Sequence, residues 1–163
     1  MPKTFSVQAD YAAAPDAVLA TATDADAVTA KFTALGAHDV EVVSRTDTAD
    51  GVRIEVTRKQ DVDVPGFAKK VLQPTNSIRL VEDWKRTADG AAATWKAEIS
   101  PARATLTGTR TLTASGTGTT ERIEGTAKAS VPLIGGKLAD FVATETAKAL
   151  DDEQAWIAKR VAR

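Results

Sequence analysis

Four charged residues fall on faces of the chain that otherwise carry apolar side chains: Arg58, Glu82, Arg110 and Glu145. Arg58 follows Ile54 and Val56 at even spacing, and Glu82 stands between Leu80 and Trp84 in an alternating segment. An isolated buried charge costs several kcal/mol, so opposite charges on inward faces should meet each other or contact water. We expect some of the four to meet inside the protein, where they could anchor a carboxylate or hydroxyl group of a ligand.

Other interpretations of these four charges stay open. A one-residue bulge reverses which side of a strand points inward, and a long basic side chain can reach the rim of a cavity. The charges then form an ordinary salt bridge or lie in solvent. Truncation of Arg110 or Glu145 to alanine distinguishes the cases, because the anchor hypothesis predicts weaker ligand binding with little loss of fold.

Large aromatic side chains are few, and four of them carry most of the aromatic surface: Trp84, Trp95, Phe141 and Trp156. Rings of this size fill ordinary protein cores, and they also line apolar cavities. Both interpretations stay open for this chain. We include Trp84, Trp95 and Phe141 among the candidate ligand-binding residues.

The segment 65–74 has a proline at each end and apolar residues within it, including Phe67 and Val71. It is too rich in proline for a strand and too apolar for a plain linker, so we expect a lid-like loop with a helical turn. Phe67 and Val71 could close over a cavity opening, and Lys69 and Lys70 permit at most a transient contact with an anionic membrane. The alternative is a solvated loop that covers one edge of the core.

The residue types needed for common catalytic and metal sites are scarce. The chain has no cysteine and one histidine, His38, so thiolate catalysis and sulfur-containing zinc sites are excluded. His38 alternates with Val40 and Val42 and could face inward as an acid or base, or it could simply begin a strand. Phosphate-binding loops, dinucleotide fingerprints and Gly-x-Ser-x-Gly elbows are also missing. We predict no catalytic residue, no metal and no cofactor, and we expect binding rather than an enzyme.

Composition limits the class of partner and the compartment. The 163 residues include 21 basic and 22 acidic side chains, so no broad positive field is available to bind nucleic acid. The chain is 43% hydrophobic and 26% charged, as in ordinary globular proteins, and its length suits one domain over residues 1–163. The first residues contain no apolar signal core and no stretch reaches membrane-spanning length, so we expect a cytoplasmic protein.

Hydrophobic periodicity predicts an α+β order of elements. Phe5 to Tyr11 alternate as a strand, a helix begins at Pro15, and a second helix runs from Asp26 to Leu35. A helix of about 25 residues then follows Gly135 to the C-terminus. Between the helices, alternating segments separated by turn residues predict six strands, at 38–46, 52–62, 78–86, 93–100, 104–114 and 119–130.

This β-α-α-β6-α order resembles the helix-grip superfamily, which includes lipid-transfer START domains, polyketide cyclases and plant pollen-allergen-like ligand carriers. More specifically, the segments 64–67, 80–84 and 131–137 resemble an actinobacterial family that is known only as a domain of unknown function. The resemblance implies a curved, seven-stranded antiparallel sheet around a long C-terminal helix, and an internal cavity. It supplies no catalytic residue.

The expected function is therefore to bind or carry a hydrophobic small molecule, lipid-like or polyketide-like, between the sheet and the last helix. One alternative is an enzyme of the cyclase or dehydratase type, with Glu82 or Glu145 as base and Arg58 or Arg110 holding an enolate oxygen. Another is a protein-interaction module without a ligand, which would have a filled interior and an exposed apolar patch.

Overall fold

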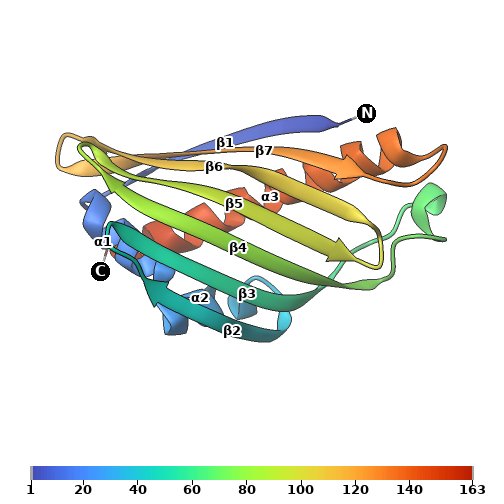
Figure 1. Ribbon diagram of the computed structural model, residues 1–163, viewed down its shortest axis with the longest axis horizontal. Coiled ribbons are helices and arrows are strands. Elements are labelled where there is room, and N and C mark those ends of the chain that lie inside the picture. The colour runs from blue at the N-terminus through green and yellow to red at the C-terminus, as the bar shows by residue number, and fades with distance from the viewer. Residues whose placement is uncertain (1, 163) are drawn as a thin grey trace.

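The computed structural model describes residues 2–162 and shows one antiparallel sheet of seven strands with three α-helices among these residues (Figure 1). The elements are β1 Lys3–Tyr11, α1 Pro15–Thr23, α2 Ala25–Ala34, β2 His38–Asp47, β3 Gly51–Asp61, the 3-10 helix η1 Gly66–Ala68, β4 Thr75–Thr87, β5 Gly90–Ser100, β6 Ala104–Ser115, β7 Gly118–Ala129 and α3 Gly135–Val161. The predicted order of strand, two helices, six strands and long helix is confirmed.

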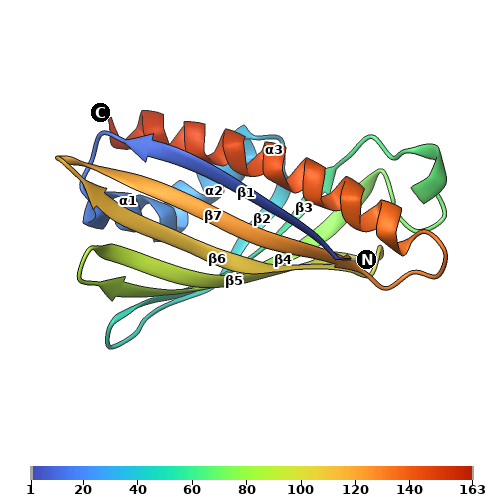
Figure 2. The ribbon, with the colours of Figure 1, turned by 90° about the horizontal axis from the view of Figure 1, so that it is seen from above.

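The sheet order is β1-β7-β6-β5-β4-β3-β2, so the first strand pairs with the last and every other neighbour is a hairpin partner. Figure 2 shows the strands curving beneath α3, which packs against β1 and β7. Alternation explains the two faces of β6, where Leu106 and Leu112 are buried while Thr107 and Thr111 are exposed. The sheet therefore presents an apolar concave face to the helix.

Two strands begin earlier than the sequence pattern predicts. β4 starts at Thr75 instead of residue 78, and β5 starts at Gly90 instead of residue 93. The buried side chain of Asn76 binds both the backbone nitrogen and the carbonyl oxygen of Gln73, at 3.1 and 2.7 Å. These bonds satisfy a polar residue inside the strand and fix the end of the preceding loop. The predicted helical turn in that loop is confirmed as η1.

Helix α3 crosses the sheet with one buried face, to which Leu138, Val142, Leu150 and Ile157 contribute. Its 27 residues correspond to about 40 Å, enough to cross a small domain. By helical spacing Ala149 falls on the same side as Leu138, but it is exposed. It lies at the edge of the buried face, one residue before Leu150, where a helical step of 100° turns a side chain outward.

The apolar core is divided into clusters at different places along the sheet. One cluster includes Trp95, Leu106 and Leu138, and another includes Trp84 and Ile157. A third joins α2 to β3. The interior also contains buried polar and charged side chains, among them Glu82, Arg110 and Glu121.

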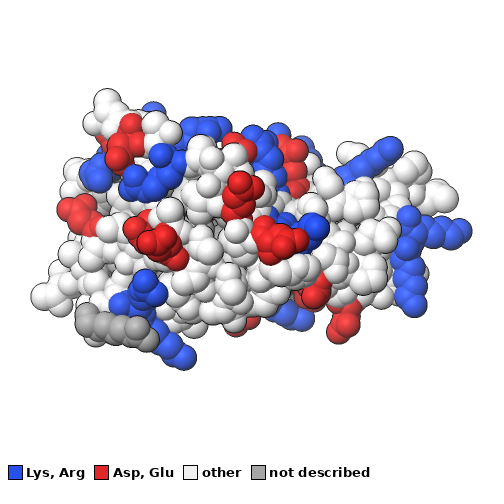
Figure 3. Space-filling view, turned by 90° about the horizontal axis from the view of Figure 1, so that it is seen from below, with Lys and Arg blue, Asp and Glu red and all other residues white. Residues whose placement is uncertain are grey.

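None of the helices in the described part of the chain is both long and apolar enough to cross a membrane. Within residues 2–162, no group of three or more histidine, aspartate or glutamate side chains is placed to hold a metal ion. Acidic and basic side chains are interspersed over much of the face that Figure 3 shows.

Candidate functional site

A cavity of about 400 Å³ lies between the concave face of the sheet and α3. Ligand cavities for small molecules usually fall in this size range and have mostly apolar walls with a few polar groups. Much of the wall here is apolar, and it includes Leu72, Ile78, Leu80, Trp95, Ile99, Ile123, Phe141 and Leu150. The expected cavity between sheet and helix is therefore present.

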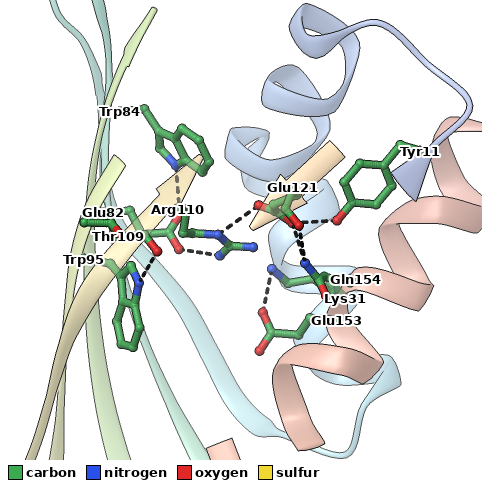
Figure 4. A network of polar contacts seen from close by, with 10 residues as sticks. All are labelled: Tyr11, Lys31, Glu82, Trp84, Trp95, Thr109, Arg110, Glu121, Glu153 and Gln154. Atoms are coloured by element: carbon green, nitrogen blue, oxygen red, sulfur yellow. Dashed lines mark hydrogen bonds and ion pairs between the residues drawn. The ribbon is translucent and has the colours of Figure 1, made fainter. Parts of the chain in front are cut away.

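The polar end of the cavity is built around Arg110 of β6. Its Nη1 donates to Glu82 Oε2 on β4 at 2.8 Å, and its Nε donates to Glu121 Oε2 on β7 at 3.1 Å (Figure 4). All three side chains are buried. Arg110 thus neutralises carboxylates from strands on both sides of its position in the sheet, and the two ion pairs fix its guanidinium group.

Further donors bind the remaining oxygens of these carboxylates. Trp84 Nε1 donates to Glu82 Oε1 at 3.0 Å, and Tyr11 Oη donates to Glu121 Oε1 at 2.6 Å. Gln154 Nε2, from α3, lies 3.3 Å from the same Glu121 oxygen. Figure 4 shows this network extending from β4 to α3. It joins the sheet to the helix through polar contacts at one end of the cavity.

A second buried ion pair connects α2 to α3. Lys31 Nζ lies 3.1 Å from Glu153 Oε1, and both side chains are less than 10% exposed. The ammonium group of Lys31 also lies 4.5 Å from the centre of the Phe32 ring. Glu153 borders the cavity, so this pair forms part of its polar wall.

Arg58 of β3 is the least satisfied charge at the cavity. Its guanidinium carbon lies 4.1 Å from the centre of the Phe32 ring, while Nε and Nη1 are shielded from solvent and have no hydrogen-bond partner. Burial lowers the pKa of Arg58, and the opposite charges of Glu153 and Glu82 only partly compensate. The side chain borders the cavity with donors still unused.

The network shifts the pKa values of several members. Burial, the charge of Glu121 and the hydrogen bond to it raise the pKa of Tyr11 far above its ordinary value. Burial alone would lower the pKa of Arg110 and raise that of Glu153, but the surrounding opposite charges outweigh burial in both cases. The pKa of Arg110 is therefore raised, and the pKa of Glu153 is lowered. Both groups remain charged near neutral pH.

Three of the four inward charges predicted from the sequence border the polar part of the cavity: Arg58, Glu82 and Arg110. Glu145 does not join them. Its side chain is 43% exposed at the cavity edge and pairs with Lys148 on the same helix at 3.5 Å. The helical pattern predicted an inward position for Glu145, but α3 turns this side chain to the cavity edge, where it is partly exposed.

The other candidate residues divide between the cavity and its surroundings. Trp95 and Phe141 border the cavity, whereas Trp84 is buried in the neighbouring cluster and contacts Glu82. Phe67 and Val71 do not border it either: Phe67 is 39% exposed, and Val71 packs against the main core cluster. These positions assign Trp84 to packing and leave the lid-like role of the loop as a prediction.

His38 does not face inward. It is an exposed residue at the start of β2, and its Nε2 lies 3.1 Å from Asp61 Oδ1. The hydrogen bond from Thr75, followed by the contact with His38, lowers the pKa of Asp61. Irregular pairing between β2 and β3 after His38 breaks the alternation that the sequence pattern assumed.

Sequence reasoning missed five members of the buried hydrogen-bond and ion-pair networks described above: Tyr11, Lys31, Glu121, Glu153 and Gln154. For two of them, the spacing to apolar residues in the sequence indicated a buried position. Glu121 stands two residues before the buried Ile123, and Glu153 lies one helical turn before Ile157. Lys31 lies among Ala27, Val28 and Phe32 on the buried face of its helix, but that face is too short to give a comparable signal.

Solved structures with this fold cover nearly the whole chain. Zhui aromatase/cyclase from Streptomyces sp. R1128 has a TM-score of 0.70 at 11% identity and covers 100% of this chain and 95% of that chain. TTHA0849 from Thermus thermophilus has a TM-score of 0.68 at 17% identity, with coverage of 98% and 97%. A START superfamily protein from Mycobacterium smegmatis has a TM-score of 0.59 at 10% identity, with coverage of 97% and 98%. At these identities the likeness shows the fold alone.

The comparisons by sequence give a family but no curated relative. No curated protein matches the chain. The family model described as "Protein of unknown function (DUF2505)" matches residues 6–161, which is nearly all of the sequence. The chain therefore belongs to the DUF2505 family, and its seven-stranded sheet and long C-terminal helix form the helix-grip fold seen in START and cyclase proteins.

Proposed function

We propose that this protein binds a hydrophobic small molecule, lipid-like or polyketide-like, in the cavity between the sheet and α3. The observation that carries the proposal is the cavity of about 400 Å³, with a largely apolar wall that also contains several charged groups. Such a combination holds an apolar body by burial and orients it through a few polar contacts. The START and aromatase/cyclase neighbours support the proposal at the level of fold.

The arrangement favours binding over the cyclase or dehydratase alternative. A catalytic base needs a carboxylate oxygen that can reach a substrate proton. Glu82 accepts hydrogen bonds from both Trp84 and Arg110, one on each oxygen, and Glu145 pairs with Lys148 at the cavity edge. Neither glutamate therefore has a carboxylate without a partner that could take a substrate proton.

The interaction-module alternative expected a filled interior and a continuous exposed apolar patch. The interior contains a cavity instead. Val43, Phe67 and Leu133 are exposed large hydrophobic residues, and they come from β2, η1 and the loop before α3. Single exposed apolar side chains need no partner protein to explain them.

Several finer expectations remain part of this proposal. The ligand enters near the loop around Phe67, contact with a membrane is at most transient, and nucleic acid is not a partner. A cytoplasmic location and an actinobacterial source remain predictions from the sequence. Native mass spectrometry of protein taken from its own host would identify a co-purifying ligand and test the proposal without a chosen library.

A binding experiment tests the cavity itself. N-phenylnaphthylamine is an uncharged apolar fluorophore, and we expect its emission to rise as it enters the parent protein. Ala97→Phe places a ring inside the cavity and should weaken this binding at least tenfold, because Ala97 borders the cavity. Thr94→Phe is the matched control, since Thr94 lies on the exposed face of the same strand. Equal binding by parent and Ala97→Phe would contradict the proposal.

A further inference from the structure

Among the described residues that border the cavity, acidic side chains outnumber basic ones. The basic side chains are Arg58, Arg110 and Lys148. The acidic side chains are Asp61, Glu82, Glu145, Asp152 and Glu153. Two buried groups just behind the wall, Lys31 and Glu121, have opposite charges and leave the difference unchanged. The cavity wall therefore has a surplus of negative charge, which disfavours entry of an anionic ligand.

Arg58 nevertheless has hydrogen-bond donors from which no described side chain accepts. Glu82 and Glu153 are the carboxylates whose charges act on it, but Glu82 binds Arg110 and Glu153 binds Lys31. The Phe32 ring lies against the guanidinium group and holds it in place without accepting a hydrogen bond in its plane. Two of the guanidinium nitrogens are shielded and unpartnered, whereas Nη2 is not among the shielded atoms. Because Arg58 borders the cavity, we expect Nη2 to be the donor that a ligand oxygen reaches.

We propose that the ligand is an uncharged carbonyl compound, that Arg58 donates a hydrogen bond to its carbonyl oxygen, and that the surplus of carboxylates excludes ligands with an anionic group. Arginine only donates, and a carbonyl oxygen only accepts, so the two groups match without a leftover proton. A carboxylate would also match Arg58, but it would add another negative charge to a wall that already has too many. This inference rests on the proposed function and narrows the chemical class of the ligand.

Three naphthalene compounds of similar shape test the inference: naphthyl methyl ketone, naphthoate and ethylnaphthalene. Each is titrated against the parent protein loaded with N-phenylnaphthylamine at neutral pH, where naphthoate is ionised. We expect the ketone to bind at least about tenfold more tightly than ethylnaphthalene, because a hydrogen bond from a charged donor has an effect of this order. Naphthoate should bind more weakly than the ketone by a similar factor.

Arg58→Met removes the donors and keeps the length of the side chain. The ketone should then bind no more tightly than ethylnaphthalene, whereas ethylnaphthalene binding should change little. Arg79→Met is the control, because Arg79 is an arginine on the exposed face of the sheet that pairs with Glu55 and Glu98. It should preserve the preference for the ketone.

The outcomes separate this inference from the proposed function. If the parent binds naphthoate best, or binds the ketone no more tightly than the hydrocarbon, the inference is wrong while binding in the cavity stands. A retained ketone preference in Arg58→Met also overturns it. If neither the fluorophore nor any of the three compounds binds the parent, the proposed function fails and the inference falls with it. The comparison of the three compounds on the parent protein tests the inferred ligand class even if Arg58→Met does not fold.

Discussion

Arg110 holds two buried carboxylates that have no other cation in hydrogen-bond contact among the described residues. Each of its two ion pairs crosses between neighbouring or nearby strands, with distances of 2.8 and 3.1 Å. Removal of one member of such a set leaves uncompensated buried charge, which is far more costly than loss of an exposed pair. The sequence-based expectation that Arg110 could be truncated with little loss of fold therefore does not suit its position.

We predict that Arg110→Met lowers the free energy of unfolding by about 3–5 kcal/mol, because Glu82 and Glu121 lose their cation. Arg79→Met, which removes an exposed pair with Glu55, should lower it far less. Urea unfolding at neutral pH measures both. Similar losses in the two variants would show that the buried network does not stabilise the fold as its geometry indicates.

Tyr11 is the one tyrosine of the chain, so its ionisation can be followed without interference from another phenol. Its pKa is raised by burial and by Glu121, which means that the group stabilises the folded state below pH 10 and loses this effect as pH rises toward the folded pKa. We predict that tyrosinate absorbance appears only together with alkaline unfolding. A phenolate signal near pH 10 in protein that keeps its folded circular dichroism would contradict the prediction.

At the scale of elements, Lys31 and Glu153 connect α2 to α3 across the interior. The pKa of Glu153 is lowered from its ordinary value of 4.5, because the charges of Lys31, Arg58 and Arg110 outweigh the effect of burial. The stabilisation is thus present above about pH 4.5 and is lost as pH falls through the lower, folded pKa. Helix α2 also packs on β3 through Val28 and Phe32, so the ion pair adds a pH-dependent contact to an apolar one.

We predict that the parent loses stability below about pH 4.5 and that Glu153→Gln shows a flatter dependence over the same range. Urea unfolding between neutral and acidic pH measures both curves. Glu153→Gln should also be less stable than the parent at neutral pH, since Lys31 is left buried without its carboxylate. If the two acid slopes coincide, Glu153 does not contribute to acid sensitivity.

The elements themselves were largely predictable from the sequence, because alternation and turn residues act locally. The early start of β4 was not, since it depends on bonds between Asn76 and Gln73 that close a loop. The site was predictable in part: the pattern identified Arg58, Glu82 and Arg110 as inward charges. It could not pair Arg110 with Glu121, because that contact depends on which strands become neighbours and on register between them.

At the scale of the whole molecule, the interior contains tightly packed regions beside a cavity. Ala127 is completely buried in the main core cluster and does not border the cavity. Ala97, by contrast, borders the cavity. Enlargement of a side chain is destabilising in a packed core, typically by about 1–3 kcal/mol, but not where empty volume can accept it. The two alanines therefore offer a direct comparison of packing within one fold.

We predict that Ala127→Phe lowers the free energy of unfolding by about 1–3 kcal/mol or more. Ala97→Phe should leave the free energy of unfolding nearly unchanged. Thermal or urea unfolding of both variants measures the difference. The contrast depends on the ligand-free protein, so samples should first be stripped of bound small molecules by unfolding and refolding. A loss as large in Ala97→Phe as in Ala127→Phe would mean that the region around Ala97 is already filled.

The three tryptophans occupy different surroundings, and only Trp95 borders the cavity. Its indole nitrogen donates to Thr109 O at 3.3 Å, and its ring lies 6.3 Å from that of Phe5. Trp84 lies in the neighbouring core cluster and donates to Glu82. The protein consequently has an intrinsic optical reporter: occupancy should alter the emission of one indole while the other two provide a steady background, so binding can be read without any added dye.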